Sequence, residues 1–165
     1  MKYQLRKSNE NDFQTIVKWF ENDEFSFFLW TGFDFEFSET YLELKKKSLN
    51  KDISCVSVYN LSEMIGYYEI HRYQKKSNWF RLVRFVINPE FRNKGYGSKI
   101  IKSIVDDYQS KPYTRLDLIV FEENINAIKL YLNQGFILEG VMRKAGISNE
   151  KYMDISILSI LGKYD

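Results

Sequence analysis

Hydrophobic residues recur along this chain with two different periods, which predict an alternation of helices and strands. Spacings of three and four residues, typical of one helix face, occur over 13–20 and 100–108. Further helices are expected from Ser38 and over 124–134. Short runs rich in β-branched and aromatic residues predict strands at 3–6, 53–59, 64–73, 79–88, 114–121, 136–143 and 151–161. The resulting order, β-α-α-β-β-β-α-β-α-β-β, is typical of an α/β fold with a mixed sheet.

Polar residues mark the expected starts of the first two helices. Ser8 or Asn9 would cap the first helix. Ser38 would cap the second, although Tyr41 stands where a glutamate or glutamine would complete a capping box. Residues 21–37, between these helices, show no helical or strand period and are expected to be irregular and aromatic.

The composition bounds the class of protein. The 165 residues suit one domain, residues 1–165, and no linker or repeat interrupts them. Aromatic residues make up 17% of the chain, enough to build a core and to line a ligand pocket as well. The net charge of +2 is too small to indicate a nucleic-acid partner. No apolar stretch approaches the roughly 18 residues that span a bilayer, so no membrane partner is expected.

The chain has one cysteine, Cys55, and one histidine, His71. A single cysteine cannot form an intramolecular disulfide, and in a strand-like run it is expected to be a small buried residue. A catalytic Cys–His pair is disfavoured, and no metal site is expected. The N-terminal residues 1–6 lack the apolar core of a signal peptide, so a cytoplasmic location is expected.

The segment 86–98 carries the clearest chemical signal. A predicted strand ends, a loop containing Gly95 and Gly97 follows, and a predicted helix begins. The first N–H groups of a helix have no partner inside it, and the positive end of the helix dipole lies there. Glycines let this backbone approach a phosphate closely. With Arg92 and Lys94 beside it, the segment is predicted to bind an anionic group.

Three well-known motifs do not fit this segment. A Walker loop would need Gly-x-x-x-x-Gly-Lys-Ser/Thr, which is absent. A dinucleotide fingerprint would need a third glycine where the chain has Ile100. The Gly-x-Ser-x-Gly turn of hydrolases is also absent. A capped turn from strand to helix, without a ligand, is the structural alternative.

Residues 92–97, Arg-Asn-Lys-Gly-Tyr-Gly, resemble the pattern Arg/Gln-x-x-Gly-x-Gly/Ala of the GNAT superfamily of N-acetyltransferases. The strand ending at 86–89 resembles that of the family. So does a second block, Asn-x-x-Ala-x-x-x-Tyr over 124–131 followed by Gly-Phe at 135–136. The resemblance covers most of the chain and is strongest over 79–142. It implies a GNAT-like α/β fold, with a mixed central sheet of about seven strands, about four flanking helices and splayed strands that form the cofactor cleft.

The resemblance also implies acetyl-CoA as co-substrate and assigns roles to residues. Backbone groups near Val86 and Ile87 would pair with the pantetheine arm, and Asn124 would bind that arm or orient its helix. Tyr131 would act as the general acid that protonates the departing thiolate. The pyrophosphate would lie on the N–H groups of Arg92, Asn93, Lys94, Gly95, Tyr96, Gly97 and Ser98.

The general base departs from the family pattern. Many members place a glutamate eight residues before the proline that follows the strand, but here that position is Arg81. Glu69, on the preceding strand, is the expected substitute, and His71 shares its face by alternation. The alternatives are structural: a solvated strand residue for Glu69, an ordinary hydrogen-bonded histidine for His71, and a core ring for Tyr131.

Residues 21–44 carry seven acidic residues and no lysine or arginine, and they are rich in aromatic rings. The resemblance places this region at the acceptor pocket, where carboxylates and ring faces would suit a cationic amine. A solvated acidic loop whose rings pack inward is the alternative. The acids are Glu21, Asp23, Glu24, Asp34, Glu36, Glu39 and Glu43.

The sequence is compatible with three functions. The first is an enzyme that acetylates a small polyamine-like or aminoglycoside-like amine, and the second acetylates a protein N-terminus. The third is a non-catalytic acetyl-CoA-binding module, suggested by Arg81 at the usual base position. Segments 139–143 and 152–155 resemble the branch that holds ribosomal-protein N-terminal and polyamine acetyltransferases. The oligomeric state is open, with a homodimer as one option.

Overall fold

The structure, a computed structural model, describes residues 2–32, 36–74, 78–111, 114–148 and 150–162. Contacts between residues divide the chain into two compact units. The N-terminal unit comprises residues 1–71 and 83–96, and the C-terminal unit comprises residues 72–82 and 97–165. Among the described residues, no helix is both long and apolar enough to cross a membrane.

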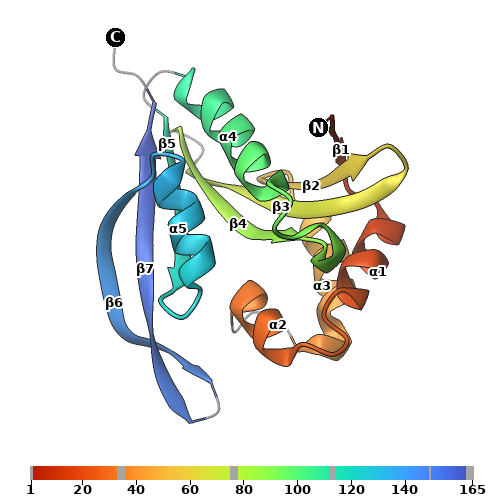
Figure 1. The fold of residues 1–165 in the computed structure, drawn as a ribbon, viewed down its shortest axis with the longest axis horizontal. Helices are drawn as coiled ribbons and strands as arrows, with labels where there is room; N and C mark the ends of the chain where they lie inside the picture. Colours follow the sequence, from red (N-terminus) through yellow and green to blue (C-terminus); the bar gives the residue numbers. More distant parts are fainter. Residues whose placement is uncertain (1, 33–35, 75–77, 112–113, 149, 163–165) are drawn as a thin grey trace. The chain divides into compact units, whose positions relative to one another are not determined.

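Seven strands form one mixed sheet in the order β1-β2-β3-β4-β5-β7-β6 (Figure 1). Strands β3 and β4 run through both units, since each unit contains part of both. The predicted α/β class and the seven strands are therefore confirmed. The strands are β1 (Gln4–Lys7), β2 (Ile53–Asn60), β3 (Glu63–Gln74), β4 (Trp79–Ile87), β5 (Arg115–Phe121), β6 (Ile137–Ser148) and β7 (Lys151–Leu161).

In the N-terminal unit, three helices cover the antiparallel strands β1, β2 and β3. They are α1 (Glu10–Lys18), α2 (Glu24–Thr31) and α3 (Thr40–Ser48). Their apolar faces form one core with the strands, because burying apolar surface is the main favourable term in folding. This core contains Phe13, Ile16, Phe20, Phe27, Trp30, Leu44, Cys55, Met64, Tyr67 and Val86. The expected burial of Cys55 is confirmed, and burial raises the pKa of its thiol.

Two expectations for this unit were wrong. Residues 21–37 are not irregular throughout, because they contain α2, capped by the side chain of Asp23 on the N–H of Ser26. The aromatic run of α2 has no single apolar face, so its period is hidden. The next helix does not begin at Ser38. A short 3-10 helix, η1 (Phe37–Glu39), precedes α3.

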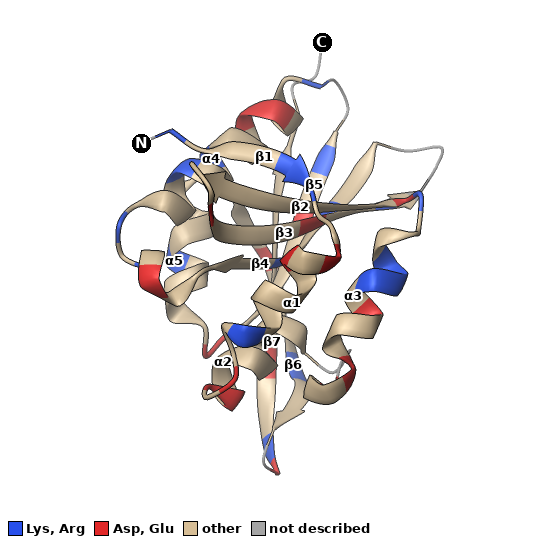
Figure 2. Ribbon diagram, turned by 90° about the vertical axis from the view of Figure 1, so that its right-hand side faces the viewer, with Lys and Arg blue, Asp and Glu red and all other residues tan. Residues whose placement is uncertain are grey.

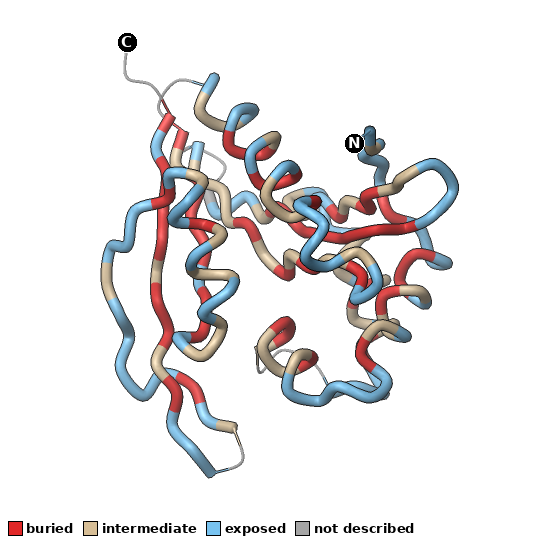
Figure 3. Tube along the Cα trace, viewed as in Figure 1, coloured by how far each residue is buried: buried red, intermediate tan, exposed pale blue. Residues whose placement is uncertain are grey.

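The C-terminal unit contains two helices, α4 (Tyr96–Gln109) and α5 (Ile125–Asn133). The first residue of α4, Tyr96, belongs to the N-terminal unit. The described residues thus hold five α-helices, where about four were expected. The apolar stripe of α4 is buried, as its period predicts: Ile100, Ile101, Ile104 and Val105. Figure 3 shows β7 largely buried and the edge strand β6 largely exposed.

The parallel pairing of β4 with β5 is short. It runs from Trp79↔Arg115 to Arg81↔Asp117, although β4 continues to Ile87 and β5 to Phe121. On its other side, β5 pairs with β7 along its whole length.

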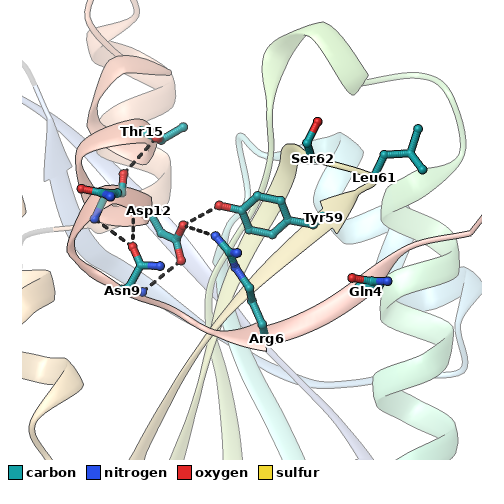
Figure 4. A pocket seen from close by; sticks show the side chains of 9 residues that line it. Gln4, Arg6, Asn9, Asp12, Thr15, Tyr59, Leu61 and Ser62 are labelled. Atoms are coloured by element: carbon teal, nitrogen blue, oxygen red, sulfur yellow. Dashed lines mark hydrogen bonds and ion pairs between the residues drawn. The ribbon is translucent and has the colours of Figure 1, made fainter.

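A buried carboxylate fixes the start of α1. Asn9 caps the helix and forms a reciprocal capping box with Asp12. Asp12 also accepts hydrogen bonds from the Tyr59 hydroxyl at 2.5 Å and the Ser57 hydroxyl at 2.9 Å, and it pairs with Arg6 at 3.0 Å. Figure 4 shows that four members of this network, Arg6, Asn9, Asp12 and Tyr59, line a surface pocket. Because the polar groups satisfy one another, the network is part of the fold.

We predict that Asp12→Asn destabilises the protein by about 1–3 kcal/mol, because it leaves buried donors poorly matched. Burial alone would raise the pKa of Asp12, but hydrogen bonds from Tyr59, Asn9 and Ser57 hold that pKa below its ordinary value of 3.8. The stability due to the carboxylate is thus full above about pH 4 and is lost as the pH falls through the folded-state pKa. The free energy of unfolding, measured with urea, should therefore differ between wild type and variant by an amount that becomes smaller below about pH 4.

Asp106→Asn is the matched control, since that carboxylate is exposed and pairs with Lys102 on the same helix. It should change the free energy of unfolding by less than about 0.5 kcal/mol. A difference for Asp12→Asn that stayed constant down to pH 2 would contradict the assigned role of the carboxylate.

Candidate functional site

The loop between β4 and α4 has the backbone of an anion site. Strand β4 ends at Ile87. The side chain of the next residue, Asn88, accepts from the N–H of Glu90 and caps a short 3-10 helix, η2 (Pro89–Phe91). Asn93 and Gly95 then adopt positive φ angles of 59° and 79°. These turns bring the chain to the first residue of α4, where helical N–H groups lack partners within the helix.

The outer side of this loop is open. Residues 92–95 are exposed, and a Cβ atom placed on Gly95 would meet no heavy atom within 4 Å. The positive φ of Gly95 favours glycine, so the residue serves the turn rather than close packing. Open space, the N–H groups at the start of a helix and positive charge suit a pyrophosphate, so the residues present fit the CoA that the sequence implied.

The side chains of the loop divide into outward and inward groups. Lys94 lies over the ring of Phe91, with its Nζ atom 5.0 Å from the ring centroid, and Arg92 donates to the carbonyl of Ile87 at 3.2 Å. Tyr96 is buried and accepts a hydrogen bond from Asn60 at 3.1 Å. Tyr96 therefore anchors the loop, and it can offer a ligand only its backbone.

The C-terminal unit holds the other residues of the second sequence block. Asn124 caps α5, since its side chain accepts from the N–H of Ala127 at 3.3 Å. Ser98 accepts from Gln134 at 2.9 Å, which ties the start of α4 to the end of α5. The ring of Tyr131 packs edge-on against Phe136, with centroids 5.6 Å apart.

Burial raises the pKa of Tyr131 well above its ordinary value. The hydroxyl therefore stays protonated near neutral pH, as a general acid must.

Glu69 lies at the centre of a buried cluster in the N-terminal unit. Its side chain is 0% exposed, and it pairs with Arg84 at 2.8 Å and with His71 at 2.6 Å. The Tyr67 hydroxyl donates to its other oxygen at 3.0 Å. Sequence reasoning selected Glu69 and His71 but missed Arg84. The signal was available, because a lone arginine in the apolar run 82–87 requires a buried partner of opposite charge.

Arg81, at the usual base position of the family, is part of a structural ion pair. Its Nε atom lies 2.7 Å from the buried carboxylate of Asp117, and its Nη1 atom donates to Tyr73 at 2.9 Å. Asp117 also accepts from the indole of Trp79 at 2.9 Å. The arginine thus holds the beginning of β4 against β5 and has no basic lone pair to offer an amine.

The described part of the acidic stretch follows α2, η1 and α3. Figure 2 shows acidic segments at the start of α2 and near the start of α3, whereas the end of α3 is basic. The carboxylates of Glu21, Asp23, Glu24, Glu36 and Glu39 are exposed. Asp34 lies outside the described residues. Rings of the stretch, such as Phe27 and Trp30, pack inward, in accordance with the structural alternative for those two residues.

The glycine loop at the start of a helix, on a mixed sheet of this order, is the architecture of a CoA-dependent acyltransferase. Comparison with known proteins identifies the family: residues 13–136 match the acetyltransferase (GNAT) family, and the chain belongs to it. It is an N-acetyltransferase that takes its acetyl group from acetyl-CoA.

Individual relatives are more distant. The spermine/spermidine N(1)-acetyltransferase of Bacillus subtilis is 29% identical over 115 residues, which cover 61% of this chain and 74% of the relative. Two solved structures share the fold, each with a TM-score of 0.81. One is spermidine N-acetyltransferase from Vibrio cholerae in complex with CoA and spermine, 23% identical and covering 96% of this chain and 95% of the other. The second is the ribosomal L7/L12 alpha-N-protein acetyltransferase RimL in complex with CoA, 16% identical, covering 100% and 97%.

We predict that acetyl-CoA at 100 times its dissociation constant stabilises the fold by about 2.7 kcal/mol. Gly97→Glu should abolish this effect, because the new side chain brings bulk and negative charge to the start of α4. The measurement is the melting temperature with and without acetyl-CoA.

Gly140→Glu is the charge-matched control, since a Cβ at Gly140 meets nothing within 4 Å and the residue lies on β6. It should keep the full shift. If Gly97→Glu kept the shift as well, the start of α4 would not be the pyrophosphate site.

Proposed function

We propose that this N-acetyltransferase acts on a polyamine-like acceptor that carries two or more amines. The observation that carries this proposal is the group of exposed carboxylates at the start of α2 and around η1, within residues 21–44, which contain no lysine or arginine. Such a surface attracts cations, and the effect is strongest for ligands with several charges. The likeness to a spermine/spermidine acetyltransferase supports the same acceptor class.

The acidic stretch and the loop between β4 and α4 approach each other in the N-terminal unit. The pKa of Asp23, which caps α2, is lowered by hydrogen bonds from Ser26 and by the positive charge of Arg92. An acceptor held by the start of α2 would therefore lie near the loop that we propose for the pyrophosphate of acetyl-CoA. The two substrates of a direct transfer must meet in this way.

On the donor side, we propose that the loop residues Arg92 to Ser98 hold the pyrophosphate through their N–H groups. Val86 and Ile87 would pair with the pantetheine arm. The carbonyl of Ile87 already accepts from Arg92, so that pairing would use the remaining backbone groups of the two residues. Asn124 would act mainly by capping α5, with its side-chain N–H groups left for the pantetheine.

The chemistry of the transfer requires two proton movements. The acceptor ammonium loses one proton to a base, and its nitrogen then attacks the thioester carbon. The C–N bond forms, the C–S bond breaks, and the departing sulfur takes a proton for which Tyr131 is the proposed donor. The nitrogen loses its second proton, which returns to Tyr131 through solvent. The products are the acetamide, CoA thiol and one proton held by the base. We propose that this base belongs to the buried cluster around Glu69.

A protein N-terminus is the competing acceptor, since the fold of RimL is equally similar. One experiment separates the two acceptors. Thiol release from acetyl-CoA is measured with spermidine, with a simple monoamine and with a peptide whose side chains are uncharged.

We propose that the two units act as one domain, because β3 and β4 belong to both. A homodimer and a cytoplasmic location remain predictions.

We predict that the Michaelis constant for spermidine rises with salt while the turnover number stays nearly constant. Exposed charge attraction is screened over about 8 Å at physiological ionic strength. Glu36→Gln together with Glu39→Gln should have the same effect, with Glu63→Gln and Glu150→Gln as the matched pair outside the stretch. A peptide as the best acceptor, or a Michaelis constant insensitive to both changes, would contradict the acceptor class.

We predict that Tyr131→Phe lowers the turnover number by roughly 10²–10⁴-fold and leaves the dissociation constant of acetyl-CoA unchanged, since one hydroxyl is lost and the ring remains. Tyr108→Phe is the control. Its pKa is also raised by burial, to about 12, and its ring packs against Phe80 at 5.0 Å. Steady-state and single-turnover rates with spermidine give the comparison. Equal single-turnover rates for wild type and Tyr131→Phe would make Tyr131 a packing residue.

A further inference from the structure

The cluster around Glu69 contains one group that reaches solvent. Glu69 and Arg84 have side chains that are 0% and 1% exposed, whereas the ring of His71 is 20% exposed. Tyr67, the third partner of the carboxylate, is also fully buried. Both carboxylate oxygens already accept hydrogen bonds from these three residues. A substrate proton can therefore enter this cluster through His71 but has no direct contact with Glu69.

The electrostatics of the cluster keep Glu69 ionised. Burial alone would raise its pKa, but the hydrogen bond from His71 and the charge of Arg84 outweigh burial and lower it. A carboxylate held as an anion accepts a hydrogen bond, so the Nε2 atom of His71, 2.6 Å away, must carry the proton. The Nδ1 atom of the neutral ring is then left with its lone pair. This is the arrangement in which a carboxylate orients an imidazole to act as a base.

The cluster lies on the face of β3 that the acidic stretch covers. Tyr67, Glu69 and His71 alternate along the strand and so share one face. The ring of Tyr67 lies 6.3 Å from that of Trp30, on α2. Trp30 also donates from its indole nitrogen to the carbonyl of Arg84 at 2.7 Å. Helix α2, whose start bears part of the acidic stretch proposed to bind the acceptor amine, therefore packs directly on the cluster of Tyr67, Glu69, His71 and Arg84.

We propose that His71 is the general base of the transfer and that Glu69 is a positioning residue that acts through it. This inference rests on the proposed amine acceptor. The Nδ1 atom of His71 takes one proton from the acceptor ammonium, directly or through one water, and becomes an imidazolium beside the Glu69 carboxylate. The free amine then attacks the thioester as described above, and His71 returns the proton to solvent after the product leaves.

The first test uses the fact that His71 is the single histidine of the chain. In protein labelled with ¹⁵N-histidine, NMR shows the signals of one pair of ring nitrogens. Their long-range couplings to the carbon-bound ring protons identify the tautomer. At a pH where the ring is neutral, we expect the proton on Nε2 and a free lone pair on Nδ1. A proton on Nδ1 would overturn the proposal, because that nitrogen could not then accept one.

The second test is kinetic. His71→Ala should lower the single-turnover rate with spermidine by roughly 10²–10⁴-fold, and free imidazole should restore part of it. The dissociation constant of acetyl-CoA should stay unchanged. The melting temperature should fall, because the buried Glu69 carboxylate loses one hydrogen bond, and it shows whether the variant is still folded at the assay temperature. A wild-type rate in His71→Ala, or a reduced rate that imidazole leaves unchanged, would overturn the role of His71. If the wild-type enzyme acetylated none of the amines, the proposed acceptor would fail instead.

The third test separates positioning from stability. Glu69→Gln should lower the rate when His71 is present. In the His71→Ala background, the same change should lower it no further, because residues that act as one unit are not additive. Melting temperatures report any loss of fold independently. If the two losses multiplied in the double variant, Glu69 would act without His71, and its assignment as a positioning residue would be overturned.

Discussion

The buried ion pair of Glu69 and Arg84 is the interaction on which the N-terminal unit depends. Neither charge can reach solvent, so each requires the other, and removing one partner of such a pair typically costs about 3–5 kcal/mol. The pair joins β3 to β4. It also explains a backbone feature of β4, where Arg84 has a φ angle of 50°. A left-handed residue within a strand costs free energy, roughly 1–3 kcal/mol, and persists only where its surroundings fix it.

The surroundings of Arg84 provide that fixation. Its guanidinium is held by Glu69, and its carbonyl accepts from Trp30. The side chain and the backbone of one residue thus connect the sheet to α2. The same contacts place His71 beside an anion that stays ionised. A charge that is costly to bury therefore serves both the packing of the strands and the electrostatics of the proposed site.

The backbone geometry of the candidate site could be predicted from the sequence, whereas its side chains could be predicted only in part, since Glu69 and His71 were selected and Arg84 was missed. The loop at 92–97 follows from local rules, because a strand end, two glycines and an apolar helix occur within a few residues. Its turn at Gly95 has the positive φ that glycine permits. The helix period likewise predicted the buried stripe of α4. Asn9 capped α1 as expected, since its partner Asp12 lies three residues away.

Contacts between residues far apart in the sequence were harder to predict. Glu69 and Arg84 are 15 positions apart, and no local rule shows that they meet. The helix α2 was missed because its rings, including Phe27, Trp30 and the exposed Phe25, surround it on several sides and hide its period. The family resemblance located the usual base position at Arg81. Only the structure shows that this arginine is committed to Asp117.

In the proposed mechanism, the acidic stretch and the buried carboxylate have opposite effects on the protonation of the acceptor, so the two would serve different purposes. Exposed carboxylates along α2 and η1 attract a polycation, but they also stabilise its protonated, unreactive form. An exposed carboxylate has a pKa near 4 and is a weak base toward an ammonium. An imidazole is a stronger base near neutral pH, and a buried anion beside it stabilises the imidazolium that forms. Glu69 can supply that anion without drawing the substrate cation to itself, because the protein encloses it completely. Binding and proton transfer can then be assigned to separate groups, exposed acids for the first and the His71–Glu69 pair for the second.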